Sequence, residues 1–290
     1  MDLIDLHTHS LKSDGAQTPA DVIRTAHAAG LRAVALSDHD NVEGVPEAME
    51  EGKRLGIEVI PAVELSAQSD TELHILGYFI DVNNKKLTEA MKYALQVRDE
   101  RQEEICRKLN EQGFRITMEE AREEAHGNPV LCRAHFAQLM VRKGYAPSVQ
   151  EAFRQYLSVG CYAYSNRQAL TGPEAVSLIR DAGGIAVAAH LHLIKMEEEP
   201  LREYLRSLIP YGLEGVEGYY TDYTPELEKC YQSMASDLGL VISGGTDYHG
   251  ANKPHISIGK GRGNLAIPYS VLEGLKERQK FVHGNDSISF

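Results

Sequence analysis

Residues 3–9 read Leu-Ile-Asp-Leu-His-Thr-His, so that a short, mostly apolar run passes directly into two histidines separated by one residue. A short apolar run of this kind is typical of a buried strand. Side chains at positions i and i+2 of an extended chain point to the same side, so His7 and His9 can approach one metal ion. The same pattern, a strand that ends in potential ligands, recurs along the chain.

Six further apolar runs rich in Val, Ile and Leu resemble the first, and segments of helical period follow most of them. Parallel strands that are buried on both faces have this composition. Repeated strand–helix units predict an α/β protein with a TIM-like barrel of seven units instead of eight. The expected strands are residues 3–6, 33–36, 58–63, 73–79, 185–189, 215–217 and 240–243. The expected helices of the barrel are residues 18–29, 45–55, 172–182, 201–209, 224–238 and 268–279.

Residues 85–165 interrupt this alternation, because they contain several consecutive helical patterns and no convincing strand. Glycine and proline turns separate the patterns. We expect a metal-binding barrel made of residues 1–84 and 166–290, and a helical insertion, residues 85–165, that lies as a lid over one end of the barrel. The expected helices of the insertion are residues 85–112, 118–125, 130–143 and 149–157.

The composition restricts the partners. The 290 residues carry 30 Lys and Arg against 42 Asp and Glu, a formal net charge of -12. Excess carboxylates repel a phosphate backbone, which argues against duplex nucleic acid as a partner. No apolar run approaches the roughly 20 residues of a membrane helix, and the first residues lack the features of a signal peptide. We therefore expect a cytoplasmic protein that binds no membrane.

Potential metal ligands stand at or just after the ends of five expected strands. Five histidines and three carboxylates at one barrel mouth are costly to bury unpaired, whereas divalent cations satisfy both kinds of group. Nitrogen and carboxylate ligands without thiolate suit Mn, Fe or Zn. His74 fits less simply, because it lies early in its run; this strand is either antiparallel or short. The strand-end ligands are His7, His9, Asp14, His39, Glu64, His190, Asp247 and His249.

Six motifs resemble, in order, those of the PHP superfamily, which is named after polymerase and histidinol phosphatase. They are HTHSLKSDG (7–15), SDHDNVEG (37–44), PAVELS (61–66), HILGY (74–78), a histidine after an apolar strand (190) and GTDYHG (245–250). The resemblance implies a distorted (β/α)7 barrel, two or three divalent metal ions at its carboxyl-terminal mouth, and hydrolysis of phosphate esters.

The resemblance also implies how the ligands are shared among the ions, with Glu64 bridging. It assigns His7, His9, Glu64 and Asp247 to one ion, Asp14, His39 and His249 to another, and Glu64, His74 and His190 to a third.

Within the superfamily, the chain is similar to a branch whose members act on nucleoside 3',5'-bisphosphates or short oligoribonucleotides. The helical insertion and the run Arg133-Ala134-His135 carry this similarity. In the branch the arginine and the histidine reach the substrate phosphate, which implies that role for Arg133 and His135. A guanidinium group can donate hydrogen bonds to two phosphate oxygens at once, and the N-terminus of a helix favours a bound anion. Arg167 is a further candidate for a phosphate contact.

The segment after the fifth strand departs from the branch, which has Pro and then Gly or a basic residue after its histidine. Here His192 is an additional imidazole that either reaches the site, as a ligand or proton donor, or faces solvent. Lys195 is a candidate for the missing basic group. In the mechanism we expect, water activated between the metal ions attacks phosphorus. His190, His192 and His135 are candidates for protonating the leaving oxygen.

The expected function is therefore that of a metal-dependent phosphoesterase acting on small nucleotides. Three alternatives stay open. The first is a phosphatase for histidinol phosphate or another small ester. The second is an amidohydrolase-like enzyme that cleaves C–N bonds, because the barrel and the His-x-His pair also suit that chemistry. The third is a metal-binding regulatory module without turnover.

Overall fold

The computed structural model describes residues 2–125, 130–165 and 169–284. Seven strands form one mixed sheet in the order β1 to β7. The two edge strands meet through Tyr248, whose carbonyl accepts a hydrogen bond from the His9 N–H at 2.9 Å, so the sheet is a nearly closed barrel. The α/β class and the TIM-like barrel are thereby confirmed. The strands are β1 (Ile4–Thr8), β2 (Ala33–Leu36), β3 (Glu58–Ala67), β4 (Leu73–Tyr78), β5 (Ile185–Ala188), β6 (Leu213–Tyr220) and β7 (Val241–Gly245).

The strand β4 gives the barrel its distortion, because it runs antiparallel to both of its neighbours. The other adjacent pairs of strands are parallel. An antiparallel strand begins where its parallel neighbours end. His74, the second residue of β4, therefore lies at the carboxyl-terminal mouth, opposite Ser66 of β3. Of the two alternatives for this strand, the antiparallel one is confirmed.

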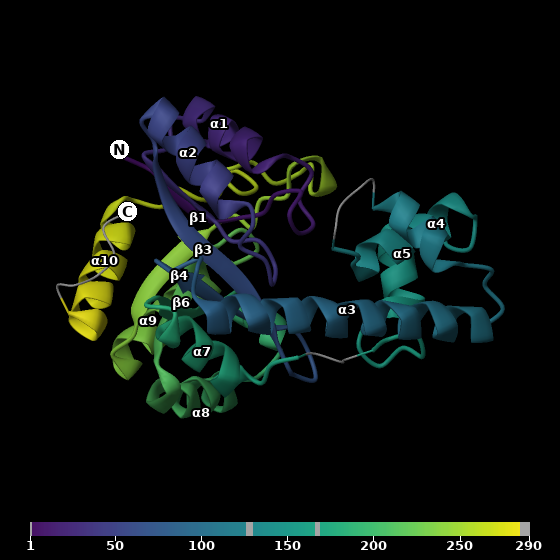
Figure 1. Ribbon diagram of the computed structural model, residues 1–290. Helices are drawn as coiled ribbons and strands as arrows, with labels where there is room; N and C mark the ends of the chain where they lie inside the picture. The colour runs from purple at the N-terminus through teal and green to yellow at the C-terminus, as the bar shows by residue number, and fades with distance from the viewer. Residues whose placement is uncertain (1, 126–129, 166–168, 285–290) are drawn as a thin grey trace.

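Amphipathic helices cover the outside of the barrel (Figure 1). Thr18 begins the first of them by accepting a hydrogen bond from the Asp21 N–H, and Pro19 occupies its first turn. Two of the helices end at glycines in the left-handed conformation, Gly56 and Gly239. The helices are α1 (Pro19–Ala28), α2 (Val45–Leu55), α7 (Gly172–Asp181), α8 (Glu198–Leu208), α9 (Pro225–Leu238) and α10 (Ser270–His283), with short 3-10 turns η2 (Leu191–Ile194), η3 (Ile209–Tyr211) and η4 (Gly250–Asn252).

Consecutive helices lie between β4 and α7. The first of them, α3, begins beside the barrel and extends well beyond it, and its far part carries α4 and α5 (Figure 1). These helices pack around a hydrophobic cluster of their own, which includes Ile105, Leu109 and Phe136. Because α3 belongs to both parts, its first half faces the barrel while its second half faces this cluster. The helices are α3 (Lys85–Glu111), α4 (Met118–Glu124), α5 (Arg133–Arg142), α6 (Val149–Ala152) and the π-helical turn η1 (Phe153–Leu157).

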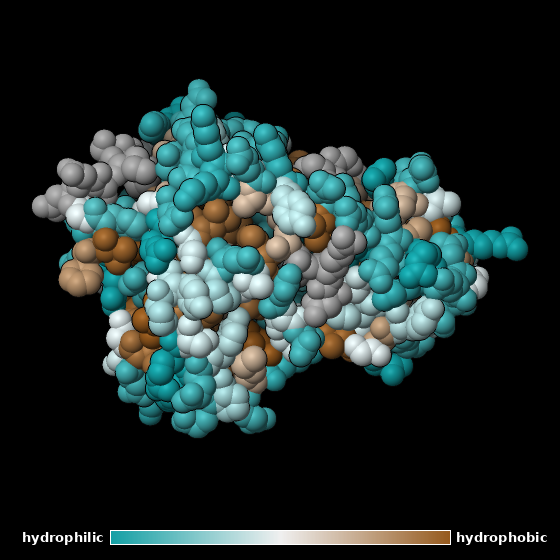
Figure 2. All heavy atoms as spheres, turned by 60° about the horizontal axis from the view of Figure 1, so that its bottom comes forward, coloured by the Kyte–Doolittle hydropathy of each residue, from teal (hydrophilic) through white to brown (hydrophobic). Residues whose placement is uncertain are grey.

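The surface in Figure 2 is mostly hydrophilic, and its hydrophobic residues form small, separate patches. Isolated apolar patches of this size are normal on a protein surface. In the described part of the chain, none of the helices combines the length and the apolar character that crossing a bilayer requires.

Candidate metal centre

Nine side chains that the sequence predicts as metal ligands meet at the mouth of the barrel. Strands β1, β3 and β4 supply three of them, and the loops after β1, β2, β5 and β7 supply the other six. Each of the nine side chains is largely or fully buried. The structure thus brings together His7, His9, Asp14, His39, Glu64, His74, His190, Asp247 and His249.

Glu64 of β3 lies at the centre of the cluster. Its Oε2 atom is 3.2 Å from His7 Nε2, 3.3 Å from His9 Nε2 and 3.1 Å from His39 Nδ1. Its Oε1 atom is 2.9 Å from one nitrogen of each of two further histidines, on β4 and after β5. One carboxylate therefore faces five imidazoles, as a ligand shared between metal ions would.

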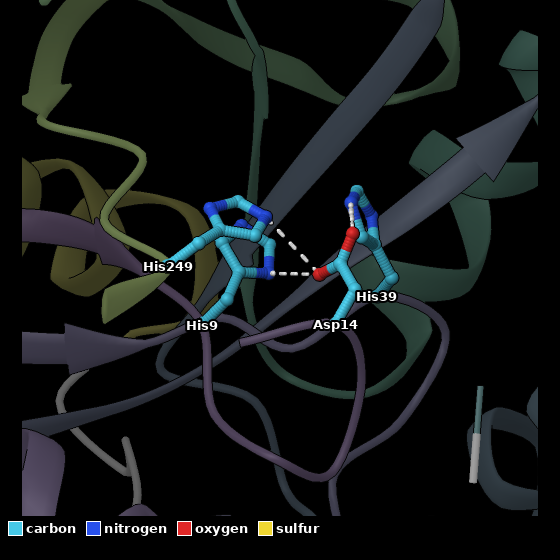
Figure 3. Close-up of side chains that lie close together, drawn as sticks. All are labelled: His9, Asp14, His39 and His249. Atoms are coloured by element: carbon cyan, nitrogen blue, oxygen red, sulfur yellow. Dashed lines mark ion pairs between the residues drawn. The ribbon is translucent and has the colours of Figure 1, made fainter. Parts of the chain in front are cut away.

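Asp14 is a second carboxylate around which histidines gather, as they do around Glu64. Figure 3 shows its carboxylate pointing between His9, His39 and His249. Its Oδ1 atom is 3.1 Å from His249 Nε2 and 3.7 Å from His9 Nδ1, while its Oδ2 atom is 3.7 Å from His39 Nε2. His9 and His39 also contact Glu64, so the groups of histidines around Asp14 and Glu64 overlap.

Asp247 lies in the loop after β7. One of its carboxylate oxygens faces the histidines of the cluster, and the other is held by neighbouring side chains. Its Oδ1 atom is 3.2 Å from His9 Nε2. Its Oδ2 atom accepts hydrogen bonds from Tyr220 Oη at 2.9 Å and Lys253 Nζ at 2.6 Å. This division leaves one oxygen for a metal ion while the other fixes the carboxylate.

The chemistry of the donor atoms fits divalent metal ions. Among the described residues, His7 Nε2, His9 Nε2, His39 Nδ1 and Glu64 Oε2 are buried atoms without a hydrogen-bond partner. Buried polar atoms are nearly always satisfied, so unsatisfied ones that converge on a single point indicate a ligand. In the described part of the chain, three groups of side chains could each hold an ion, because the ligand atoms within each group lie within 4.8 Å of one another. The groups are His9, Asp14, His39 and His249; His7, His9 and Glu64; and His39, Glu64 and His74.

Two buried carboxylates that the sequence analysis missed orient the cluster. Glu217 accepts a hydrogen bond from His7 Nδ1 at 2.9 Å and another from the His190 N–H at 2.7 Å. A carboxylate behind a ligating imidazole fixes its tautomer and turns the opposite nitrogen toward the metal. Asp5 accepts hydrogen bonds from the backbone of Thr246 and Gly259 and thereby joins β1 to the loop after β7. An ionisable residue inside an apolar strand was the available signal, since it must have a buried partner.

The loops at the mouth hold an unusual backbone. Asp40, His190 and Asp247 have positive φ angles of 48°, 27° and 56°. Such conformations cost about 1–3 kcal/mol each in non-glycine residues and concentrate at functional sites. Gly245 is required for a different reason, because a Cβ atom there would lie 2.3 Å from His7 Cβ. Glycine therefore permits β7 to approach β1 at the level of the ligands.

The carboxylates and histidines of the cluster shift one another's pKa. Burial alone lowers the pKa of His9, but Asp247 and Glu64 outweigh this effect and raise it to about 9. The pKa of His7 lies well above its usual value, because Glu64 and Glu217 overcome a similar burial effect. Burial dominates at His39 and lowers its pKa to about 3. The neighbouring carboxylates therefore favour the protonated forms of His7 and His9.

Binding of Mn²⁺ to the metal-free protein is expected to release protons. The raised pKa values of His7 and His9 favour their protonated forms, whereas only neutral imidazole binds a metal ion. The apparent affinity should therefore rise with pH while these groups titrate, and His9 should stop contributing above about pH 9. Isothermal titration calorimetry in buffers with different heats of ionisation counts the released protons. An affinity that stays constant between pH 6 and pH 9 would contradict this prediction.

A cavity of about 350 Å³ lies between the ligands and the helices that follow β4. Metal-ligand candidates such as Asp14 and Glu64 line its floor. Its roof is cationic, with Arg98 and Arg101 from α3 and Arg133 from α5. The sequence analysis identified Arg133 but neither arginine of α3. Two arginines at the spacing i, i+3 within an expected helix were the available signal, because they share one face.

The structure places Arg133 in the cavity and His135 outside it. Arg133 Nη2 donates a hydrogen bond to Glu72 Oε1 at 2.7 Å, and its guanidinium lies 5.3 Å from the centre of the Tyr164 ring. His135 is buried in α5, where its Nδ1 accepts a hydrogen bond from the Cys132 N–H at 3.1 Å. Its imidazole is not among the described groups that line the cavity.

Two of the three remaining candidates, His192 and Lys195, are not brought to the cavity. His192 is half-buried, and its ring lies 5.4 Å from the rings of Tyr220 and Tyr223. Lys195 is exposed just after the turn η2. Neither residue belongs to the described lining of the cavity. Arg167 lies outside the described residues.

A nearly closed α/β barrel with nitrogen and carboxylate ligands gathered at its mouth defines a class of protein, the metal-dependent hydrolases. The chain matches the family model of the PHP domain over residues 5–243. It belongs to the PHP domain family, as the motifs indicated.

Three similar proteins refine this assignment. A 5'-3' exoribonuclease of Haemophilus influenzae is 32% identical over 84% of this chain and 89% of its own length. A 3',5'-nucleoside bisphosphate phosphatase of Chromobacterium violaceum is 31% identical over 85% of this chain and 87% of its own length. The solved structure of an amidohydrolase from Chromobacterium violaceum, with bound sulfate and no metal, has a TM-score of 0.84 and 30% identity. The match covers 95% of this chain and 96% of that one. With the family, these relatives make the chain a metal-dependent phosphoric ester hydrolase.

Proposed function

We propose that this protein hydrolyses phosphate esters of small nucleotides, namely nucleoside 3',5'-bisphosphates or short oligoribonucleotides. The observation that carries the proposal is the cavity with metal-ligand candidates on its floor and three arginines in its roof. Such a cavity suits a substrate with a reacting phosphate at one end and further negative charge at the other. The names of the exoribonuclease and bisphosphate phosphatase relatives agree with this class of substrate.

The nine ligands described above would hold two or three divalent ions, for which Mn, Fe and Zn are the candidates. Bound ions would activate water and neutralise charge on the phosphate oxygens. In the hydrolysis, the oxygen of water forms a bond to phosphorus, the ester P–O bond breaks, and the leaving oxygen takes up a proton. Arg133 binds a phosphate oxygen from the roof. Lys253, which lines the cavity beside Asp247, adds a positive charge near the floor.

His190 is the proposed donor of that proton in a site that holds two ions, where it would not be a metal ligand. It lines the cavity, and its Nε2 atom lies 2.9 Å from Glu64 Oε1. His192 and His135, the other two candidates from the sequence, are not in the described lining of the cavity; each instead contacts a lining residue, Tyr220 or Cys132.

The size and charge of the molecule favour small substrates over long ones. A volume of about 350 Å³ lies at the low end of the range of small-molecule sites. The net charge of -12 opposes a long polyanion away from the cavity. In this proposal, residues 85–165 are an inserted helical domain that covers the site, and duplex nucleic acid is not a substrate.

Phosphate release from a panel of substrates tests the proposal. The panel contains nucleoside 3',5'-bisphosphates, 5'-monophosphates, short oligoribonucleotides and histidinol phosphate, each assayed with Mn²⁺. We expect the bisphosphates or the oligoribonucleotides to have the highest kcat/KM, and Asp247→Ala to abolish that activity. Turnover of histidinol phosphate alone would retain the metal site and refute the nucleotide substrate. Metal binding without turnover of any member would refute the proposed function as a whole.

A further inference from the structure

Tyr220, the last residue of β6, connects the metal centre to rings that the proposed mechanism does not use. Its Oη atom donates a hydrogen bond to Asp247 Oδ2 at 2.9 Å, and its side chain lines the cavity. The rings of His192 and Tyr223, which are not in the described lining, each lie 5.4 Å from the Tyr220 ring, centre to centre. Aromatic rings at this separation attract one another beyond the effect of their burial. His192, an additional imidazole in this chain, is therefore linked to Asp247 through Tyr220.

The ring of Tyr220 is held from several sides. It is 4% exposed, and the imidazole of His190 lies 5.6 Å from it, centre to centre. Tyr223 is itself fixed by the backbone, because its Oη atom accepts a hydrogen bond from the Leu191 N–H at 2.8 Å and donates one to the Glu217 carbonyl at 3.2 Å. A hydroxyl group on a ring that is packed in this way has one direction in which to donate.

Asp247 needs such support, because its backbone does not hold it in place. Its φ angle is 56°, and a non-glycine residue keeps such a conformation only where its surroundings enforce it. Its Oδ1 atom lies 3.2 Å from His9 Nε2, so the direction of the carboxylate decides whether this oxygen faces the other ligands.

The second donor to Asp247 Oδ2 is less rigid than the first. Lys253 Nζ lies 2.6 Å from this oxygen, but the Lys253 side chain is 36% exposed and extends from a loop. A lysine side chain is a flexible stem that carries a point charge, whereas the Tyr220 ring has few free torsions. The tyrosine can therefore set the direction of the carboxylate, while the lysine adds charge.

We propose that Tyr220 is a positioning residue of the metal centre: supported by His192 and Tyr223, it fixes the Asp247 carboxylate so that one oxygen faces the bound ions. This inference rests on the metal site of the proposed function and deepens it. A carboxylate that turns freely offers that oxygen to an ion for only part of the time. Loss of the Tyr220 hydroxyl should therefore weaken metal binding before any substrate is present.

Binding of Mn²⁺ to the metal-free protein, measured by isothermal titration calorimetry, tests the inference. Tyr220→Phe, which keeps the ring, is expected to weaken the binding of at least one ion by about 10- to 100-fold, the usual effect of losing a partner of a metal ligand. His192→Ala removes one support of the ring and should cause a smaller loss in the same direction. His192→Phe, which restores a ring, should bind Mn²⁺ nearly as tightly as the native protein.

Lys253→Met separates positioning from charge. Both Tyr220→Phe and Lys253→Met remove one donor to Asp247 Oδ2, but only Lys253→Met removes a positive charge. A cation beside the site repels a metal ion, so its loss favours binding. We therefore expect Lys253→Met to bind Mn²⁺ at least as tightly as the native protein, in contrast to Tyr220→Phe.

Tyr219→Phe is the matched control. Tyr219 is the preceding residue of β6, but it packs against a hydrophobic cluster and is not in the described lining of the cavity, so this variant should bind Mn²⁺ as the native protein does. Melting temperatures of the metal-free proteins provide the control for folding. Tyr220→Phe keeps the ring and leaves Asp247 bonded to Lys253, so its melting temperature should stay close to the native one.

Three results would overturn the inference: native Mn²⁺ affinity in Tyr220→Phe, equal weakening by Tyr220→Phe and Lys253→Met, or a metal-free Tyr220→Phe protein that melts far below the native one. Because the titration contains no substrate, it is independent of the assay of the proposed function. A native protein that binds Mn²⁺ but hydrolyses no phosphate ester would refute the proposed function, and the affinities of the variants would still decide the role of Tyr220. A native protein that binds no divalent ion would refute both.

Discussion

Replacing Glu64 with glutamine is expected to lower kcat by about a thousandfold or more and to remove much of the bound metal. The amide keeps the shape of the side chain but loses the charge that faces five imidazoles. A shared ligand affects every ion that it contacts, so the loss should exceed that of a single transition-state hydrogen bond, which is roughly 10²- to 10³-fold.

Kinetics and metal analysis of the same preparations check this prediction. Metal content is measured after dialysis against a fixed concentration of Mn²⁺, and kcat is measured on the best substrate of the panel. Glu58→Gln is the matched control, because Glu58 lies on the same strand at the opposite end of the barrel, where it pairs with Lys276 at 2.6 Å. A Glu64→Gln enzyme with full metal content and native kcat would refute the central position of this carboxylate.

That the candidate ligands lie together could be predicted because their positions depend on local rules. An apolar run followed by a polar ligand identifies a strand end, and the carboxyl ends of parallel strands share one side of a barrel. His74 did not fit this rule until the direction of β4 was known, and strand direction depends on pairing with β3 and β5. Glu217 was missed for a related reason: an ionisable residue in an apolar strand indicates a buried partner, but that partner, His7, lies 210 residues away and cannot be identified locally.

The roof of the cavity was harder to predict than its floor. The sequence places Arg98 and Arg101 on one face of a helix, but which way that face turns depends on how α3 packs on the barrel. The motif at Arg133 and His135 predicted two phosphate contacts on the basis of resemblance. In the structure Arg133 lines the cavity, whereas His135 is used to cap the start of α5.

Arg98→Met is expected to destabilise the protein by about 3–5 kcal/mol, the usual effect of removing one partner from a buried ion pair. Asp40 would keep its buried carboxylate while losing the guanidinium at 2.6 Å. Burial raises the pKa of Asp40, and the charge of Arg98 reverses this effect so that the pKa lies below its usual value. Without Arg98 the pKa should rise, and the loss of stability should therefore be smaller at pH 4, where Asp40 takes up a proton, than at pH 7.

Urea denaturation of the metal-free proteins measures this effect without a contribution from bound ions. The double variant Arg98→Met/Asp40→Asn should recover part of the lost free energy, because it removes the uncompensated charge as well. If Arg98→Met unfolds at the same urea concentration as the native protein, the ion pair does not join α3 to the barrel as described.

Arg101→Gln provides the sharpest comparison for Arg98→Met. Both arginines lie on α3, one turn apart, and both are 7% exposed, so burial alone predicts the same result for the two. Their partners predict opposite results. Loss of Arg98 leaves a carboxylate unpaired and should lower stability, whereas loss of Arg101 relieves repulsion among three guanidinium groups and should not. Equal destabilisation by the two variants would mean that Arg101 stabilises the fold as much as Arg98 does, although it has no hydrogen bond or ion pair with a described residue.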